Sequence, residues 1–380
     1  MTTTTTTTNT NNTNTIAVLH GAKDLRIESR PARHVDEFDA QVDVKATGLC
    51  GSDLHYYRHG RNGDFVIREP LAMGHEAAGV VTAVGKSVTH IKPGDRVAIE
   101  AGIYCTSCDL CKSGRYNLCP NLRFASSAKT YPHLDGTLQT RFTHPARLLH
   151  KMPDGVTFEQ ASLVEPLSVV LHGSRRSGVR AGHHVAIFGA GAVGLLAASV
   201  VKAQGATKVT VIDIDENRLN FAMEHNFADN IVLLPLGPRP TSTAESLDAS
   251  KKTADSILAQ STSNGYDVVF ECTGVETCMQ ASIFAAKAGG KVVYIGMGTP
   301  NATLPVSAAA FREVDLVGVF RYSNTYNDAL GMFAANKLAS ADSLVTHKFK
   351  LNDSKQAFET LSNGKDSSNR PAIKIMIGDY

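Results

Sequence analysis

The sequence predicts an α/β protein that combines a doubly wound parallel sheet with a second, strand-rich domain of barrel-like character. Its 380 residues exceed one average domain, which favours two. Apolar strands alternate with helical segments in the middle of the chain. Short alternating runs bounded by turn signals precede them. We expect a disordered polar tail at 1–15, the strand-rich domain at 16–167 and 323–380, and the parallel sheet at 168–322.

Composition and charge narrow the class of protein. Hydrophobic residues make up 43% and charged residues 19%, as in soluble globular chains. The formal net charge of +2 and the lack of any run of about 18 apolar residues predict no nucleic-acid partner and no membrane partner. The tail, MTTTTTTTNTNNTNT, lacks the basic start and apolar core of a signal peptide. We therefore expect a cytoplasmic protein with reduced cysteines.

The strand-rich domain begins with four short runs that contain strand-forming residues. They are IAVLH, VDVKATG, AAGVVTAVG and KPGDRVAIE, starting at residues 16, 42, 77 and 92. Alternation interrupted by Gly and Pro turns is typical of barrel strands. The C-terminal segment predicts two helices, near 326–337 and 353–362, and a closing strand, AIKIMIG. We expect this segment to return to the first domain.

Four of the seven cysteines fall in one short segment, YCTSCDLCKSGRYNLCP. Their spacing, C-x2-C-x2-C-x7-C, lets four thiolates converge on one ion, so we predict a structural zinc site formed by Cys105, Cys108, Cys111 and Cys119. A site closed by four protein ligands leaves no position for a substrate. An Fe–S cluster and surface thiols without metal are the alternatives. The first is disfavoured because the run C-x2-C-x2-C-x3-C-P does not occur.

The stretch HHVAIFGAGAVG joins an apolar strand to a helix through G-x-G-x-x-G at Gly189, Gly191 and Gly194. In this context backbone N–H groups and the helix N-terminus can bind a pyrophosphate, so we predict a dinucleotide site rather than a turn used only for packing. The next strand, KVTVID, ends at Asp213, whose carboxylate can accept ribose hydroxyls and repel a 2′-phosphate. Arg218 could bind such a phosphate, but Asp213 favours NAD over NADP.

Further strands and helices complete the sheet. Strands are expected at 230–234, 266–274, 291–298 and 315–320, and helices at about 215–226, 246–262 and 275–288. Ligands bind at the carboxyl ends of such strands. The residues expected near the nicotinamide are Cys272, Thr273, Gly274, Ile295, Gly296, Met297, Val319, Phe320 and Arg321. For Cys272 and Cys278, packing is the stronger interpretation.

A nicotinamide site also needs a group that stabilises an alkoxide, which can be a Tyr–Lys pair, a histidine or a metal. GLCGSD contains Cys50, and MGHEAAG contains His75 next to Glu76. Cysteine and histidine both bind zinc, and a catalytic zinc site keeps one position open. Each segment alone is more often explained by packing or by a hydrogen bond. The two together suggest a metal.

The order GLCGSD, GHE, four-cysteine loop, EPLSV, glycine motif and FRYSNT resembles the zinc-dependent medium-chain dehydrogenase/reductase superfamily. Within it, the chain is similar to the polyol dehydrogenases, over essentially everything after residue 15. The resemblance implies a GroES-like catalytic domain, a Rossmann dinucleotide-binding domain, NAD, one catalytic and one structural zinc per subunit, and a homotetramer. Some animal members have lost the four cysteines of the loop, which this chain keeps. The four retained cysteines therefore favour the fungal or bacterial branches of the polyol dehydrogenases.

The resemblance also assigns roles to single residues. Cys50 and His75 match the two catalytic zinc ligands, and Glu76 matches the neighbouring glutamate of that site. Alcohol dehydrogenases have a cysteine ligand where this chain has Glu165, which in the polyol enzymes holds a water at the metal. Which glutamate binds the ion directly stays open. The positions that match polyol contacts are Tyr56, Glu165, Arg321 and Tyr322, and those that match cofactor contacts include Val193, Asp213 and Arg218.

We therefore expect an NAD-dependent zinc polyol dehydrogenase that oxidises a secondary hydroxyl of sorbitol, xylitol or a similar sugar alcohol to the ketose. Zinc would lower the pKa of the hydroxyl, and Ser52 or the water held by Glu165 would relay the proton. A surface ion pair is the alternative role for Arg321. The alternative activities are L-arabinitol 4-dehydrogenase and other zinc alcohol, threonine or sugar dehydrogenases of the same fold. The near-neutral charge disfavours a zinc module that binds nucleic acid.

Overall fold

The computed structural model describes residues 13–237, 240–261, 264–298 and 301–379. Of the predicted tail, residues 1–12 lie outside the described part. Residues 13–15 begin strand β1 (Thr13–Gly21), so the prediction of a tail reaching residue 15 is wrong for these three. The reason is a buried polar contact: Asn14 is 3% exposed and its amide donates to Gln139 Oε1 at 2.6 Å.

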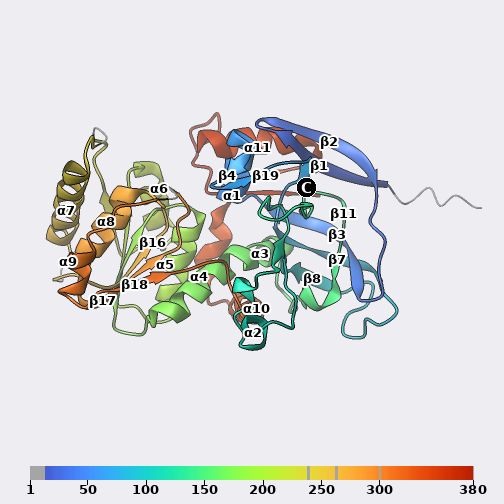
Figure 1. Ribbon diagram of the computed structural model, residues 1–380, viewed down its shortest axis with the longest axis horizontal. Coiled ribbons are helices and arrows are strands. Elements are labelled where there is room, and N and C mark those ends of the chain that lie inside the picture. Colours follow the sequence, from blue (N-terminus) through green and yellow to red (C-terminus); the bar gives the residue numbers. More distant parts are fainter. Residues whose placement is uncertain (1–12, 238–239, 262–263, 299–300, 380) are drawn as a thin grey trace, which may run out of the picture.

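One body of the molecule is built on a six-stranded parallel sheet (Figure 1). Its order is β15-β14-β13-β16-β17-β18, so the chain starts in the middle and adds strands first to one side and then to the other. This confirms the predicted doubly wound sheet. The strands are β13 (His184–Phe188), β14 (Lys208–Asp213), β15 (Asn230–Leu233), β16 (Tyr266–Glu271), β17 (Ala286–Tyr294) and β18 (Asp315–Gly318).

Helices connect these strands and cover the sheet. They are α5 (Ala192–Ala203), α6 (Glu216–Glu224), α7 (Thr243–Ala259), α8 (Glu276–Ala285) and α9 (Val306–Ala310). The helix predicted to reach residue 288 ends at Ala285, because Ala286 already pairs with Tyr266 in the sheet. The strand predicted to reach residue 274 ends at Glu271, where the chain turns.

The second body is strand-rich, as predicted. Its main sheet has the order β12-β8-β7-β3-β20-β19, with β11 paired to β3. The C-terminal strands β19 and β20 join this sheet, so the chain returns to its first part as expected. The strands are β3 (Asp39–Gly48), β7 (Glu76–Val84), β8 (Arg96–Ile99), β11 (Arg141–Pro145), β12 (Leu149–Lys151), β19 (Val345–Phe349) and β20 (Lys374–Gly378).

A smaller sheet of β2, β1 and β6 lies in the same body, and helices α10 and α11 form where the C-terminal segment predicts them. Short elements surround the cysteines. The bounds are β2 (Asp24–Pro31), β6 (Leu71–Ala72), β9 (Gly102–Ile103), β10 (Arg123–Phe124), α2 (Asp109–Lys112), α10 (Tyr326–Ala334) and α11 (Ser354–Asn363). Within the described ranges, no helix is long and apolar enough to cross a membrane.

Two helices that the sequence analysis did not predict position the site. Helix α1 (Gly51–His59) follows Cys50, whose N–H donates to the side chain of Asp53 at 3.1 Å. Helix α4 (Val164–Ser177) follows the short α3 (Phe158–Ser162) and contacts both β7 and β17, one strand from each main sheet. It lies between the two bodies in Figure 1. The predicted domain boundary at residue 167 falls inside α4, and the division into domains stays a prediction.

Candidate active site

The glycine motif lies between β13 and α5, as predicted. Gly189 has φ 102°, a conformation that favours glycine, and a Cβ on Gly194 would lie 1.8 Å from the Gly189 oxygen. A Cβ on Gly191, by contrast, would meet no atom within 4 Å. The first and last glycines therefore allow a tight turn, and the middle one leaves open space at the N-terminus of α5, which suits a pyrophosphate.

Asp213 ends β14 and its carboxylate is tied to the glycine loop. One oxygen accepts from the N–H of Ala190 at 2.6 Å, and the other accepts from the N–H groups of Ile214 and Asp215 at 2.7 and 2.9 Å. Arg218 lies on α6 with its Nε 3.8 Å from a carboxylate oxygen of Asp215. The acid thus lies at the strand end next to the glycine turn, where the sequence predicts a ribose contact.

The other predicted cofactor residues follow the carboxyl ends of β16, β17 and β18, three neighbouring parallel strands. They therefore lie along one edge of the sheet: Cys272, Ile295, Gly296, Met297, Val319, Phe320 and Arg321. Val193 lies in the first turn of α5. Sequence analysis missed Glu271, a fully buried carboxylate that accepts from the N–H groups of Thr273 and Gly274 and so fixes the turn after β16. Burial raises the pKa of Glu271.

The three predicted zinc ligands on the strand-rich body come together. The ligand atoms of Cys50, His75 and Glu76 all lie within 4.8 Å of one another. Strands β3 and β7 pair antiparallel with Gly48 opposite Glu76, which brings the segment after β3 beside the start of β7. A Cβ at Gly48 would lie 2.3 Å from Glu76 Oε2, so only glycine leaves room for this carboxylate.

The surroundings of this cluster fit a cation. His75 Nδ1 is buried without a hydrogen-bond partner among the described residues, and its nearest acid is Asp53, at 3.4 Å. Burial alone would lower the pKa of His75, but the negative charges of Asp53 and Cys50 raise it well above its usual value. Thiolate, imidazole and carboxylate ligands that leave a position open are typical of catalytic zinc.

Glu76 has a partner that the sequence analysis missed. Lys374 Nζ, on β20, lies 2.7 and 2.9 Å from the two carboxylate oxygens of Glu76 and 3.0 Å from the Leu49 oxygen. The side chains of Lys374 and Glu76 are 4% and 1% exposed. The lysine lies some 300 positions along the chain from its partner, and no local pattern near it indicates the pairing.

Glu165 lies in the first turn of α4 and is buried, but it is not part of the tight three-residue cluster within the described residues. Burial raises the pKa of Glu165 to about 7, with the charge of His75 opposing the shift and that of Glu76 adding to it. The structure therefore favours Glu76 over Glu165 as the third member of the cluster. Glu165 is a carboxyl group that can gain or lose a proton near neutral pH.

One predicted polyol contact, Arg321, is connected to the metal cluster by an aromatic ring that packs against both. Arg321 has its guanidinium 3.8 Å from the centre of the Phe124 ring, and that ring lies 5.5 Å from the ring of His75. Arg321 Nη1 is buried and has no hydrogen-bond partner among the described residues. Burial lowers the pKa of Arg321 to about 10, which leaves it charged at neutral pH. An exposed ion pair, the alternative for Arg321, does not describe this environment.

The remaining predicted contacts are partly engaged by the protein itself. Tyr56, on α1, is 2% exposed, and its hydroxyl accepts from the N–H of Ala128 at 3.0 Å. Tyr322 is buried, with its hydroxyl 3.5 Å from that of Tyr326. Ser52, the predicted proton relay, lies in the first turn of α1, two residues after Cys50, and is half-buried.

The four cysteines of the loop converge as predicted. Three pairs of sulfur atoms lie 3.5 to 3.9 Å apart, and a tetrahedron of Zn–S bonds has edges of about 3.8 Å. The backbone N–H groups of Ser107 and Cys108 lower the pKa of Cys105 to about 5, which favours its thiolate. The sulfur geometry fits a zinc ion held by Cys105, Cys108, Cys111 and Cys119.

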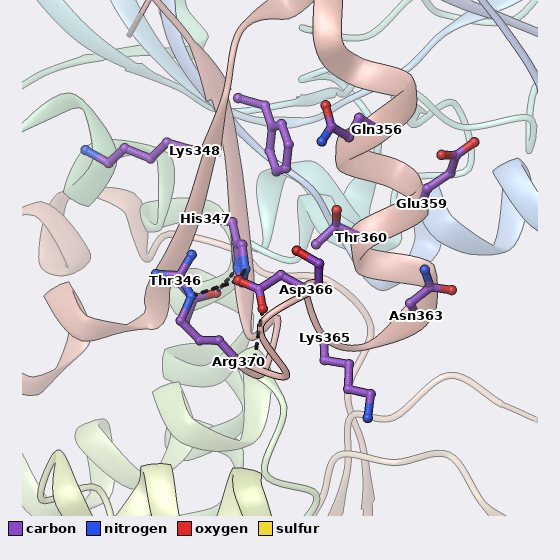
Figure 2. Close-up of a pocket in the computed structure, with 12 residues that line it drawn as sticks. Thr346, His347, Lys348, Gln356, Glu359, Thr360, Asn363, Lys365, Asp366 and Arg370 are labelled. Atoms are coloured by element: carbon purple, nitrogen blue, oxygen red, sulfur yellow. Dashed lines mark hydrogen bonds and ion pairs between the residues drawn. The ribbon is translucent and has the colours of Figure 1, made fainter.

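A cavity of about 690 Å³ opens between β19, α11 and the loop that follows α11 (Figure 2). Three of its ionisable groups pair with one another: His347 Nε2 and Arg370 Nε lie 3.1 and 3.2 Å from Asp366 Oδ2. None of its twelve lining residues is a predicted site residue. Size alone therefore does not identify the active site.

Comparison with known proteins agrees with this geometry. Residues 36–154 match the alcohol dehydrogenase GroES-like domain, and residues 192–335 match the zinc-binding dehydrogenase family. The sorbitol dehydrogenase of Gallus gallus is 40% identical over 360 residues, 95% of each chain. Sorbitol dehydrogenase 1 of Saccharomyces cerevisiae is 40% identical over 344 residues, 90% of this chain and 92% of its own. The crystal structure of L-idonate 5-dehydrogenase from Escherichia coli superposes with a TM-score of 0.83 and 26% identity, over 97% of this chain and 98% of the other.

The parallel sheet with its glycine turn, the GroES-like domain and the Cys–His–Glu cluster define the class of the zinc-dependent medium-chain dehydrogenases. This confirms the predicted class. Within that superfamily, the chain belongs to the polyol dehydrogenase group, the family of the sorbitol dehydrogenases it matches over nearly its whole length.

Proposed function

We propose that this protein is an NAD-dependent zinc polyol dehydrogenase that oxidises a secondary hydroxyl of sorbitol, xylitol or a similar sugar alcohol to the ketose. One observation supports this most directly. Arg321 stacks on Phe124, whose ring lies against His75 of the three-residue metal cluster. A half-buried cation, whose buried Nη1 has no hydrogen-bond partner among the described residues, therefore lies near the metal ligands. A substrate with several hydroxyls can satisfy that donor, whereas a plain alkyl alcohol leaves it unpaired.

Cys50, His75 and Glu76 would hold the catalytic zinc, and the four cysteines of the loop would hold the structural zinc. When bound, the catalytic ion supplies a Lewis acid that lowers the pKa of the substrate hydroxyl. Glu165, with a pKa of about 7, is suited to receive the proton that leaves this hydroxyl, directly or through water. Ser52 is the second candidate for this relay.

The nicotinamide cofactor would bind along the carboxyl edge of the parallel sheet. The open face of Gly191 and the N-terminus of α5 suit its pyrophosphate. Asp213 would accept hydrogen bonds from the ribose and repel the additional phosphate of NADP. The backbone N–H groups that donate to Asp213 hold its carboxylate at the end of β14, where it would discriminate between NAD and NADP.

The experiment that tests this proposal is a substrate panel with the zinc-loaded enzyme. Sorbitol, xylitol, L-arabinitol, L-threonine and ethanol would each be assayed with NAD and with NADP. The highest kcat/KM is expected for sorbitol or xylitol with NAD, and the product should be the ketose. A highest value for ethanol or threonine would move the protein to another branch of the class, and a preference for NADP would refute the role of Asp213.

We further propose a cytoplasmic homotetramer. The requirement for thiolates at two zinc sites favours a reducing compartment. Strand β18 forms the edge of the parallel sheet, and the neighbouring Phe311 side chain is 89% exposed, which suits a contact between copies of the chain. Light scattering combined with size-exclusion chromatography measures the subunit number, and a monomer at micromolar concentration would contradict this proposal.

A further inference from the structure

The segment that contains the four cysteines lies directly against the segment that contains Arg321 and Tyr322. We call residues 104–120 the cysteine loop and residues 319–324 the substrate segment. Asn117 Nδ2 donates to the Phe320 oxygen at 2.8 Å. At the other end of the substrate segment, the N–H of Asn324 donates to the Tyr116 hydroxyl at 2.8 Å, and Asn324 Nδ2 donates to the Gly114 oxygen at 2.9 Å. The cysteine loop thus binds the substrate segment on both sides of Arg321 and Tyr322.

The substrate segment needs such support because its backbone is strained. Arg321 has φ 52° and Asn324 has φ 56°, a region that residues other than glycine seldom adopt. Asparagine tolerates this region better than arginine does, so the strain is greatest at Arg321. The oxygen bound by Asn117 belongs to the peptide group that precedes Arg321. That hydrogen bond fixes the plane from which the φ of Arg321 is measured, and so helps to hold the direction of its side chain.

The supporting side of this contact is rigid. Tyr116 and Asn117 lie in the short 3-10 turn Tyr116–Leu118, which Cys119 follows directly, and both are buried. The Tyr116 hydroxyl donates to Glu100 Oε1 at 2.7 Å, and its ring stacks on Tyr104 at 4.2 Å. The cavity where Tyr116 and Asn117 approach Arg321 and Tyr322 has a volume of about 10 Å³, no more than one water needs.

We propose that Tyr116 and Asn117 are positioning residues for the polyol: the cysteine loop holds the substrate segment in the conformation that presents Arg321 and Tyr322 to the substrate. This inference rests on the proposed function, in which Arg321 and Tyr322 contact substrate hydroxyls. It gives the four-cysteine site a second consequence besides stability. Because the four-cysteine site orders Tyr116 and Asn117, it also increases the affinity for the polyol.

Steady-state kinetics of the zinc-loaded enzyme test the proposal. Asn117→Ala and Tyr116→Phe are each expected to raise KM for sorbitol about 5- to 10-fold, the range that the loss of one or two hydrogen bonds allows. KM for NAD and the zinc content should stay at the wild-type values. A general loss of structure would instead reduce the active fraction, which lowers kcat and leaves KM for sorbitol unchanged. Ser113→Ala is the matched control, because the Ser113 hydroxyl donates within the cysteine loop, to the Leu110 oxygen.

Hydrogen exchange of the peptide that spans the substrate segment provides the second measurement. Exchange there should become faster in Asn117→Ala and Tyr116→Phe and stay unchanged in Ser113→Ala. Arg321→Lys separates this inference from the proposed function. If Arg321→Lys leaves KM for sorbitol unchanged, the proposed substrate contact is wrong. If Arg321→Lys raises it while neither Asn117→Ala nor Tyr116→Phe does, the positioning role is wrong, even where exchange becomes faster.

Discussion

Removal of the charge on Lys374 should destabilise the zinc-stripped protein strongly. Lys374→Met keeps most of the length of the side chain and removes its ammonium group. Glu76 then stays buried, at 1% exposure, without its ion-pair partner. Water cannot replace the ammonium, because both side chains are almost completely covered.

The magnitude follows from the contact. Two charges about 2.8 Å apart attract each other by roughly 6 kcal/mol at an effective dielectric constant of 20, and the cost of burying both ions offsets part of this. Removal of one partner of a buried pair typically costs about 3–5 kcal/mol. We expect the free energy of unfolding to fall by that amount. Bound zinc should reduce the loss, because the cation then balances the charge of Glu76.

Urea unfolding followed by circular dichroism measures this loss, since the chain has no tryptophan to report by fluorescence. The matched control is Lys252→Met, because Lys252 pairs with Asp248 at 2.6 Å but on the surface, with 75% and 63% exposure. The double variant Glu76→Gln/Lys374→Met should recover most of the stability, since no unpaired charge remains. A loss in Lys374→Met no larger than in Lys252→Met would refute the reasoning.

The remaining predictions concern the cofactor, the proton, the pH dependence and the metals. Asp213→Ala should raise the ratio of kcat/KM with NADP to that with NAD by about 10-fold or more, because one repulsive charge is lost; an unchanged ratio contradicts the ribose assignment. Glu165→Gln should lower kcat by about 10²–10⁴ with little change in NAD affinity, and full activity would exclude Glu165 from proton transfer. Burial lowers the pKa of His144 from 6.5 to about 4, so between these values the folded protein binds fewer protons than the unfolded chain, and its free energy of unfolding falls as the pH decreases. His144→Gln should remove on the order of 3 kcal/mol of that decrease, seen as a flatter urea midpoint between pH 6.5 and 4. Dialysis against a chelator should remove two zinc ions per chain and abolish activity, and activity that persists in zinc-free protein would disprove the metal assignment.

Local patterns in the sequence determined much of this protein. The strand–GAGAVG–helix sequence predicts the glycine turn because hydrophobic period and glycine positions are properties of neighbouring residues. The cysteine spacing predicts a converged loop for the same reason, and the sulfur atoms do converge. Cys50, His75 and Glu76 became one site only through a resemblance, since nothing in a local pattern connects residues from two separate segments of the chain.

Only the tertiary structure decided the contacts between distant segments. The pairing of β3 with β7 and of β3 with β20 brings Glu76 and Lys374 together, and neither strand predicts its partner, because side chains alternate on every strand alike. The contact of Asn117 with Phe320 spans more than 200 positions and depends on how two loops fold back toward each other. Chain-local preferences determine elements and motifs. Long-range packing determines which polar side chains come into contact in the interior, and the proposed chemistry depends on those contacts.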